Sequence, residues 1–99
     1  MYGLFGSMTA TPGQRAALAG YLLEGLRDMP GCLSYIVAED PVHADKLWIT
    51  EVWDSAEKHR ESVNLPQVQA AIAKARPIIA AMGDRQETVP LGGVGLKSR

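Results

Sequence analysis

Alternation of apolar residues with other residues marks the predicted strands of this chain. The first covers residues 2–9, where residues 2, 4, 6 and 8 share one face. Residues 32–39 and 46–53 are two further runs rich in β-forming side chains, and the polar loop between them predicts an antiparallel hairpin. A last strand is expected over residues 86–91, where Pro90 fits an edge strand better than a central one.

Apolar residues spaced three and four positions apart predict the helices. The first helix is expected to start at Pro12 and to end before Pro30. A short helix follows Asp54, whose carboxylate can accept a hydrogen bond from the first turn. A longer helix is predicted over residues 66–83, with a bend at Pro77 because proline cannot complete the helical hydrogen bonds.

The order strand, helix, strand, strand, helix, strand predicts an α+β protein with a ferredoxin-like βαββαβ fold, in which helices cover one face of an antiparallel sheet. No internal repeat or linker divides the 99 residues, so a single domain over residues 1–99 is expected. In the second and third predicted strands, apolar residues occupy both faces. The face without helices would expose a large apolar patch, so we expect a homodimer that packs sheet face against sheet face.

Charge and composition exclude several classes of partner. Ten Lys and Arg against eleven Asp and Glu give a net charge of -1, and no basic run could neutralise a row of phosphates, so nucleic acid is not an expected partner. No apolar stretch is long enough to span a bilayer, and the first residues lack the pattern of a secretory signal, so no membrane association is expected. The single Cys32 cannot form an internal disulfide, which favours a cytoplasmic location. Cys32, His43 and His59 do not have zinc-ligand spacing, so no metal site is predicted.

His59 and Glu51 are the candidate catalytic residues. On a helix after Asp54, His59 lies in line with Ala56 and Val63 and therefore points toward the sheet. An imidazole there can act as an acid or a base, or it can be a core histidine that hydrogen-bonds a neighbour such as Glu51. Glu51 interrupts an apolar strand face, so its carboxylate is expected to be half buried, with either a structural or a chemical role.

Four further residues are candidates for contact with a ligand. Trp53 shares a strand face with Glu51 and can form the wall of a pocket or simply belong to the core. Tyr35 and Asn64 can offer hydrogen bonds, although Tyr35 can also be core and Asn64 can shape the turn before the next helix. Arg76 can hold an anionic oxygen or be a solvated helix charge.

A resemblance to the antibiotic biosynthesis monooxygenase family, including its quinol monooxygenase members, is carried by the segment LWITEVWDSAEKHRESVNLPQVQAAIAKARPIIA. The characteristic residues are Glu51 and Trp53 at the end of the strand and His59 in the following helix. The segment MPGCLSYIVAEDP is also similar to the family's approach to its second strand, so the likeness covers nearly the whole chain. The resemblance implies a dimeric α+β barrel, in which two sheets pack together and each subunit has its own pocket between helices and sheet.

Members of this family with known activity oxidise phenolic polycyclic aromatics or quinols with molecular oxygen and need no metal, haem or flavin. The resemblance therefore implies a cofactor-independent monooxygenase, in which His59 serves as the base or proton relay. Trp53 would form a wall of the pocket, and Glu51 would orient a neighbouring group. The other three candidate residues would complete the lining.

A haem-degrading branch of the family has the same fold but uses an asparagine in its first strand. The first strand here, YGLFGSMT, has no asparagine, which argues against haem breakdown. The alternative from a different class is a dimeric protein that binds a small ligand without catalysis, because many members of the family have no established activity. Oxygen consumption with a panel of quinols would separate the two hypotheses.

Overall fold

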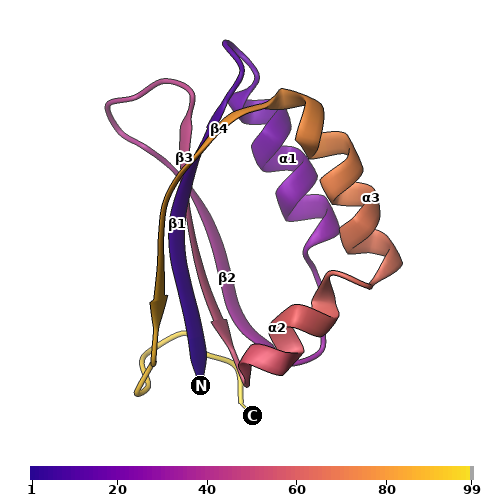
Figure 1. Ribbon diagram of the computed structural model, residues 1–99. Helices are drawn as coiled ribbons and strands as arrows, with labels where there is room; N and C mark the ends of the chain where they lie inside the picture. Colours follow the sequence, from indigo (N-terminus) through magenta and orange to yellow (C-terminus); the bar gives the residue numbers. More distant parts are fainter. Residues whose placement is uncertain (99) are drawn as a thin grey trace.

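Two layers make up the molecule: a four-stranded antiparallel sheet and a layer of helices that covers one of its faces (Figure 1). This computed structural model describes residues 1–98. In chain order the elements are β1 (Tyr2–Ala10), α1 (Arg15–Gly25), β2 (Cys32–Glu39), β3 (Lys46–Trp53), α2 (Ala56–Ser62), α3 (Pro66–Ala75), the short 3-10 helix η1 (Arg76–Ile78) and β4 (Ile79–Thr88). The short helix predicted after Asp54 and the helix predicted to start at Pro66 are both present, as α2 and α3. The predicted ferredoxin-like α+β fold is confirmed.

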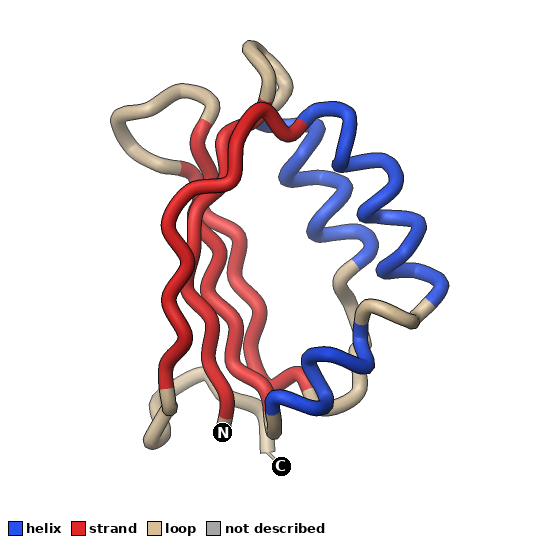
Figure 2. Tube along the Cα trace, viewed as in Figure 1, coloured by secondary structure: helices blue, strands red, loops and turns tan. Residues whose placement is uncertain are grey.

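The sheet has the strand order β2-β3-β1-β4, and every neighbouring pair of strands is antiparallel. The hairpin predicted from the second and third strands is therefore confirmed. β1 and β3 form the centre of the sheet, and β2 and β4 form its edges (Figure 2). Among residues 1–98, no helix has the length and apolar character needed to cross a membrane.

The core lies between the sheet and the helices. Leu47 of β3 and Leu18 of α1 are completely buried, and Trp53 is 1% exposed. Gly25 ends α1 at its contact with α3, where a Cβ atom would overlap the side chain of Ala71. The missing side chain at Gly25 therefore lets the two helices approach closely while both cover the sheet.

The sheet face without helices carries apolar side chains. Phe5 of β1 and Ile36 of β2 are 43% and 56% exposed on this face. The ring of Phe5 stacks on that of Trp48, with 5.2 Å between the ring centroids. Trp48 and Trp53 lie on opposite faces of β3, as the alternation predicts. The single chain thus exposes an apolar patch of the kind that the sequence pattern predicts.

Two predicted helix starts are wrong. α1 begins at Arg15 and not at Pro12, because Gly13 adopts a left-handed turn conformation with a φ of +78° before the helix starts. α2 is capped by Ser55 rather than by Asp54. The hydroxyl of Ser55 accepts a hydrogen bond of 3.1 Å from a backbone N–H in the first turn, which is the usual role of a capping serine.

The third helix and the last strand also differ from the prediction. α3 ends at Ala75 and not at residue 83, and η1 leads directly into β4. Pro77 has no N–H to donate, and its ring clashes with the preceding helical turn, so it ends the helix instead of bending it. The last strand consequently spans Ile79–Thr88 and not residues 86–91, and Pro90 lies beyond it.

Candidate functional site

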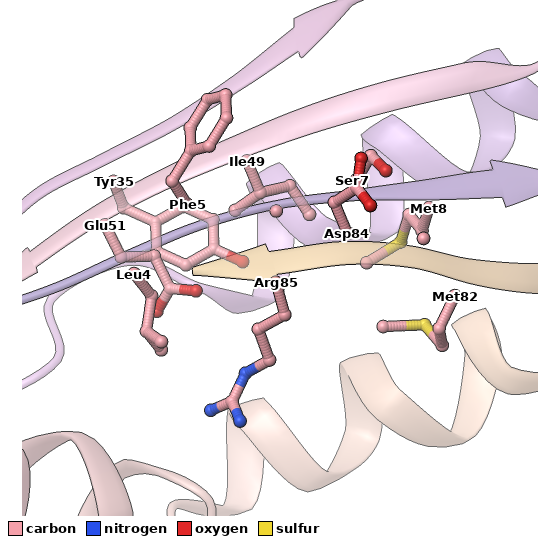
Figure 3. A pocket seen from close by; sticks show the side chains of 12 residues that line it. Leu4, Phe5, Ser7, Met8, Tyr35, Ile49, Glu51, Met82, Asp84 and Arg85 are labelled. Carbon is pink, nitrogen blue, oxygen red and sulfur yellow. The ribbon is translucent and has the colours of Figure 1, made fainter. Parts of the chain in front are cut away.

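A cavity of about 170 Å³ lies against the sheet beside β4 (Figure 3). All four strands contribute to its lining, which is mostly apolar. An apolar cavity with a few polar groups is the usual form of a small-molecule site. The residues that line it are Leu4, Phe5, Gly6, Ser7, Met8, Tyr35, Ile49, Glu51, Met82, Gly83, Asp84 and Arg85.

Strand register brings the polar groups of the cavity onto one face of the sheet. Tyr35 of β2 and Leu4 of β1 are both paired with Glu51 of β3, so these three residues form one row across the sheet. Arg85 of β4 is paired with Gly6, two residues along β1 from Leu4. Alternate residues of a strand point to the same side, so Arg85 and Glu51 project from the same face, as Figure 3 shows.

Glu51, Trp53 and His59 form a cluster at the end of β3. The indole Nε1–H of Trp53 donates a hydrogen bond of 2.9 Å to Oε1 of Glu51. The same oxygen lies 3.8 Å from Nε2 of His59, which the capped helix α2 holds over the end of the strand. The imidazole packs edge-on against the indole, with 5.4 Å between the ring centroids. Trp53 of the same strand and His59 of the next helix therefore both approach the carboxylate of Glu51.

Burial raises the pKa of the Glu51 carboxyl above its ordinary value. The hydrogen bond from Trp53 and the nearby charges of His59 and Arg85 act in the opposite direction, and burial prevails. Only 15% of the Glu51 side chain is exposed, which accounts for the strength of the burial effect. A carboxylate whose pKa is raised toward neutrality is a better base than an ordinary glutamate and can also be protonated more easily.

Tyr35 is the partner of Glu51 across the sheet, and its side chain lines the same cavity. Burial, followed by the negative charge of Glu51, raises the pKa of Tyr35 strongly. Tyr35 therefore keeps its proton throughout the neutral range and can donate a hydrogen bond into the cavity. The cavity thus combines a group that can accept a proton with a group that can donate a hydrogen bond to an oxygen anion.

Comparisons with known proteins identify the family. A family model described as antibiotic biosynthesis monooxygenase matches residues 1–74. The chain belongs to the antibiotic biosynthesis monooxygenase family. A crystal structure of a protein from Chloroflexus aurantiacus J-10-fl that bears this family name is 60% identical in sequence. The match covers 97% of this chain and 98% of that chain, with a TM-score of 0.95.

More distantly related members of the antibiotic biosynthesis monooxygenase family share the fold of this chain. A structure from Deinococcus radiodurans is 24% identical and has a TM-score of 0.76, over 99% of this chain and 100% of that chain. One from Caulobacter crescentus CB15 is 17% identical with a TM-score of 0.81, over 92% of this chain and 90% of that chain. Both bear the same family name. Among proteins with curated functions, none matches the chain significantly.

The structure places the six candidate residues of the sequence in three groups. Glu51 and Tyr35 line the cavity. Trp53 and His59 contact Glu51 but do not line the cavity themselves. The remaining two are exposed and lie away from it: Asn64 in the turn between α2 and α3, and Arg76 at the start of η1.

Arg85 and Met82 are lining residues that the sequence pattern does not single out. The pattern places residue 82 on a helix and residue 85 in the loop after it, whereas both belong to β4. The signal that could have located them is Pro77, because a helix that stops there leaves the following residues free to form a strand.

The other histidine and the only cysteine lie away from the cavity. His43 is exposed in the loop between β2 and β3, where its backbone N–H donates a hydrogen bond to the Asp40 carboxylate. Cys32 begins β2, and burial raises the pKa of its thiol. Within the part of the chain that the structure describes, no group of three or more His, Cys, Asp or Glu side chains could hold a metal ion.

Proposed function

We propose that this protein is a cofactor-independent monooxygenase that oxidises a quinol or a related phenolic compound with molecular oxygen. The observation that supports this proposal is the half-buried Glu51 carboxylate with a raised pKa, which lines an apolar cavity beside the protonated hydroxyl of Tyr35. Removal of a phenolic proton makes an aromatic ring electron-rich enough to reduce oxygen directly. The protein then has to supply a base, a fixed orientation and a cavity with little water.

The reaction balances without another reductant. A quinol gives up four electrons in total to one molecule of oxygen. One oxygen atom forms a new carbon–oxygen bond on the ring, and the other leaves as water, so the product is a hydroxyquinone. The residues of the cavity take part only in proton transfer and in stabilising the negative charge on oxygen.

Glu51 is the residue proposed to take the phenolic proton. The resemblance to the family favours His59 as the base, but His59 contacts Glu51 and does not line the cavity. His59 can accept the proton from Glu51 once the two side chains move closer than their present 3.8 Å, and its side chain is 21% exposed, so the proton can pass on to solvent. Trp53 positions the carboxylate through its hydrogen bond, and Tyr35 stabilises the phenolate.

Oxygen consumption tests this proposal. Purified wild-type protein is expected to consume oxygen with at least one member of a panel of hydroquinones and anthrones. Glu51→Gln keeps the shape of the side chain but removes the base, so the rate should fall by about 10²- to 10⁴-fold. Glu57→Gln, on the exposed side of α2, is the matched control and should keep the wild-type rate.

Two outcomes would contradict the proposal in different ways. A Glu51→Gln variant with the full rate would remove Glu51 from the reaction. A wild-type protein that binds members of the panel but oxidises none of them would identify the protein as a small-ligand binder without catalysis.

The proposed functional unit is a homodimer that packs through the sheet face without helices. The exposure of Phe5 and Ile36 supports this assembly, because a contiguous apolar patch on a sheet face is costly to leave in water. Ile36→Glu should shift the protein from dimer to monomer in analytical ultracentrifugation. Leu23→Glu, which replaces an exposed apolar residue on α1, should leave the dimer intact. A wild-type monomer at micromolar concentration would rule out the assembly.

A further inference from the structure

We propose that the ligand of the cavity is a single-ring phenol with an anionic substituent, and that Arg85 binds this anion. The inference rests on the proposed function only where it assigns the ligand as a substrate. The binding itself can be measured without turnover. The inference narrows the proposed substrates from quinols in general to phenols with one ring and one negatively charged substituent. It also gives a role to Arg85, a residue that the sequence pattern does not single out.

The size of the cavity, which is partly open to solvent, favours a ligand with one aromatic ring. Its volume is about 170 Å³. Engineered cavities of about 150 Å³ with apolar walls are known to bind benzene, so this volume accommodates one ring with small substituents. Leu4, Ile49 and the two methionines Met8 and Met82 supply the apolar contacts for such a ring. A second fused ring would have to leave these walls and extend into solvent.

Arg85 provides a positive charge at the cavity that forms no salt bridge within residues 1–98, although it acts on the pKa of Glu51 from a greater distance. Among residues 1–98, no carboxylate lies within ion-pair distance of its guanidinium group. Glu87 is the acidic residue on the same face of β4, and its negative charge contributes to raising the pKa of Tyr2, after burial of the Tyr2 side chain. The side chain of Asp84 projects away from Arg85 (Figure 3). A planar guanidinium group in this position can form paired hydrogen bonds with a carboxylate of the ligand.

The charges of the cavity also determine how the ligand is oriented. Glu51 would repel an anion at its own end of the cavity, and the group of such a ligand that can give it a proton is the phenolic hydroxyl. Arg85 and Tyr35 lie on the same side of the sheet as this carboxylate (Figure 3). An anionic group at Arg85 therefore leaves a phenolic hydroxyl of the same ring directed toward Glu51 and Tyr35. The charged substituent selects the ligand and at the same time positions the proton that is removed.

Anaerobic calorimetry with three probes tests this inference, because without oxygen the probes bind but do not react. The probes are 2,5-dihydroxybenzoate, hydroquinone and 1,4-dihydroxy-2-naphthoate, which differ by one carboxylate or by one ring. Wild-type protein should bind 2,5-dihydroxybenzoate about tenfold more tightly than hydroquinone. It should bind the two-ring naphthoate no more tightly than the one-ring benzoate.

An Arg85→Gln variant separates the charge from the shape of the cavity. Arg85 is exposed, so the substitution leaves the core intact. The variant should lose the preference for 2,5-dihydroxybenzoate and should bind hydroquinone as the wild type does. Arg60→Gln, an exposed substitution on α2, is the control and should keep the preference.

Equal binding of benzoate and hydroquinone by the wild type, or an unchanged preference in Arg85→Gln, would overturn the role of Arg85. Tenfold tighter binding of the naphthoate would overturn the limit to one ring. Oxygen consumption with uncharged or larger quinols would then leave the proposed function standing. Selective binding of the benzoate without any oxygen consumption would support the role of Arg85 in ligand binding and would contradict the proposed monooxygenase function.

Discussion

The two tryptophans of β3 each donate a hydrogen bond to a carboxylate, and the two carboxylates have opposite properties. Trp53 donates to Glu51 at 2.9 Å on the helix side of the sheet. Trp48 donates to Asp40 at 2.8 Å on the other side. The pKa of Glu51 is raised by burial, whereas the pKa of Asp40 is lowered.

The difference lies in the other groups around each carboxylate. Asp40 also accepts hydrogen bonds of 2.8 Å from the backbone N–H groups of Val42 and His43, and these donors stabilise its charge at the protein surface. Within residues 1–98, Glu51 accepts one side-chain hydrogen bond, from Trp53, and most of its side chain is removed from water. The same tryptophan–carboxylate pair therefore holds a loop in one place and supplies a proton acceptor to a cavity in the other.

The largest expected effect is the loss of Trp53. Its side chain is almost completely buried, so Trp53→Ala leaves a large void and should lower the free energy of unfolding by about 3–5 kcal/mol. Urea denaturation followed by circular dichroism measures this change. Trp53→Phe fills much of the same space, so its free energy of unfolding should fall clearly less than that of Trp53→Ala. A Trp53→Ala variant as stable as the wild type would show that the core does not depend on this residue.

Substitution of the two carboxylates should change stability in opposite directions at pH 7. Asp40→Asn removes a charge that the folded state stabilises, so this variant should be less stable than the wild type. Glu51→Gln removes a charge that the folded state disfavours and keeps an oxygen acceptor for Trp53, so this variant should be at least as stable. Both changes should be smaller than that of Trp53→Ala. Effects of the same sign would contradict the contrast between the two pairs.

The pH dependence of these two variants sharpens the comparison. The folded-state pKa of Glu51 is raised, so the wild type loses stability as the pH rises from 4.5 through this pKa, and the advantage of Glu51→Gln should vanish below pH 4.5. The folded-state pKa of Asp40 is lowered, so its contribution is complete above pH 3.8 and is lost as the pH falls through the folded pKa. Urea denaturation at a series of pH values measures both differences. Differences that do not change with pH would show that titration of these groups is not their cause.

The smallest expected effect concerns Trp48, which is partly buried on the sheet face without helices. Lys46 places its ammonium group 4.5 Å from the centroid of the Trp48 ring. Lys46→Met keeps much of the apolar chain but removes this cation–π contact, which should cost about 0.5–1 kcal/mol in the free energy of unfolding. The same substitution should leave the carboxyl pKa of Glu51 unchanged, as measured by NMR titration, because Lys46 is not among the groups that shift it. A large shift of that pKa would connect two sites that the sheet separates.

The local pattern of residues was sufficient to predict the first three strands, the faces of β3 and the three members of the cluster. Alternation placed Trp48 and Trp53 on opposite faces, and the helical spacing of His59 directed it toward the sheet. These predictions depend on the direction of side chains, which repeats every two residues in a strand and every 3.6 residues in a helix. Both repeats can be recognised from the sequence alone. The resemblance to the family was likewise visible in one continuous segment.

Only the tertiary structure showed which residues share the cavity. Arg85 comes beside Glu51 because β4 pairs with β1, which is distant in sequence and brings Gly6 opposite Arg85. Asn64 is only five residues from His59 in sequence but lies away from the cavity in space, and Arg76 lies away from it as well. The raised pKa of Glu51 depends on how many elements cover it, and no local pattern reports such burial. The order of residues thus determined the first three strands and the faces of β3, and the packing of distant strands decided where β4 lies and which side chains meet.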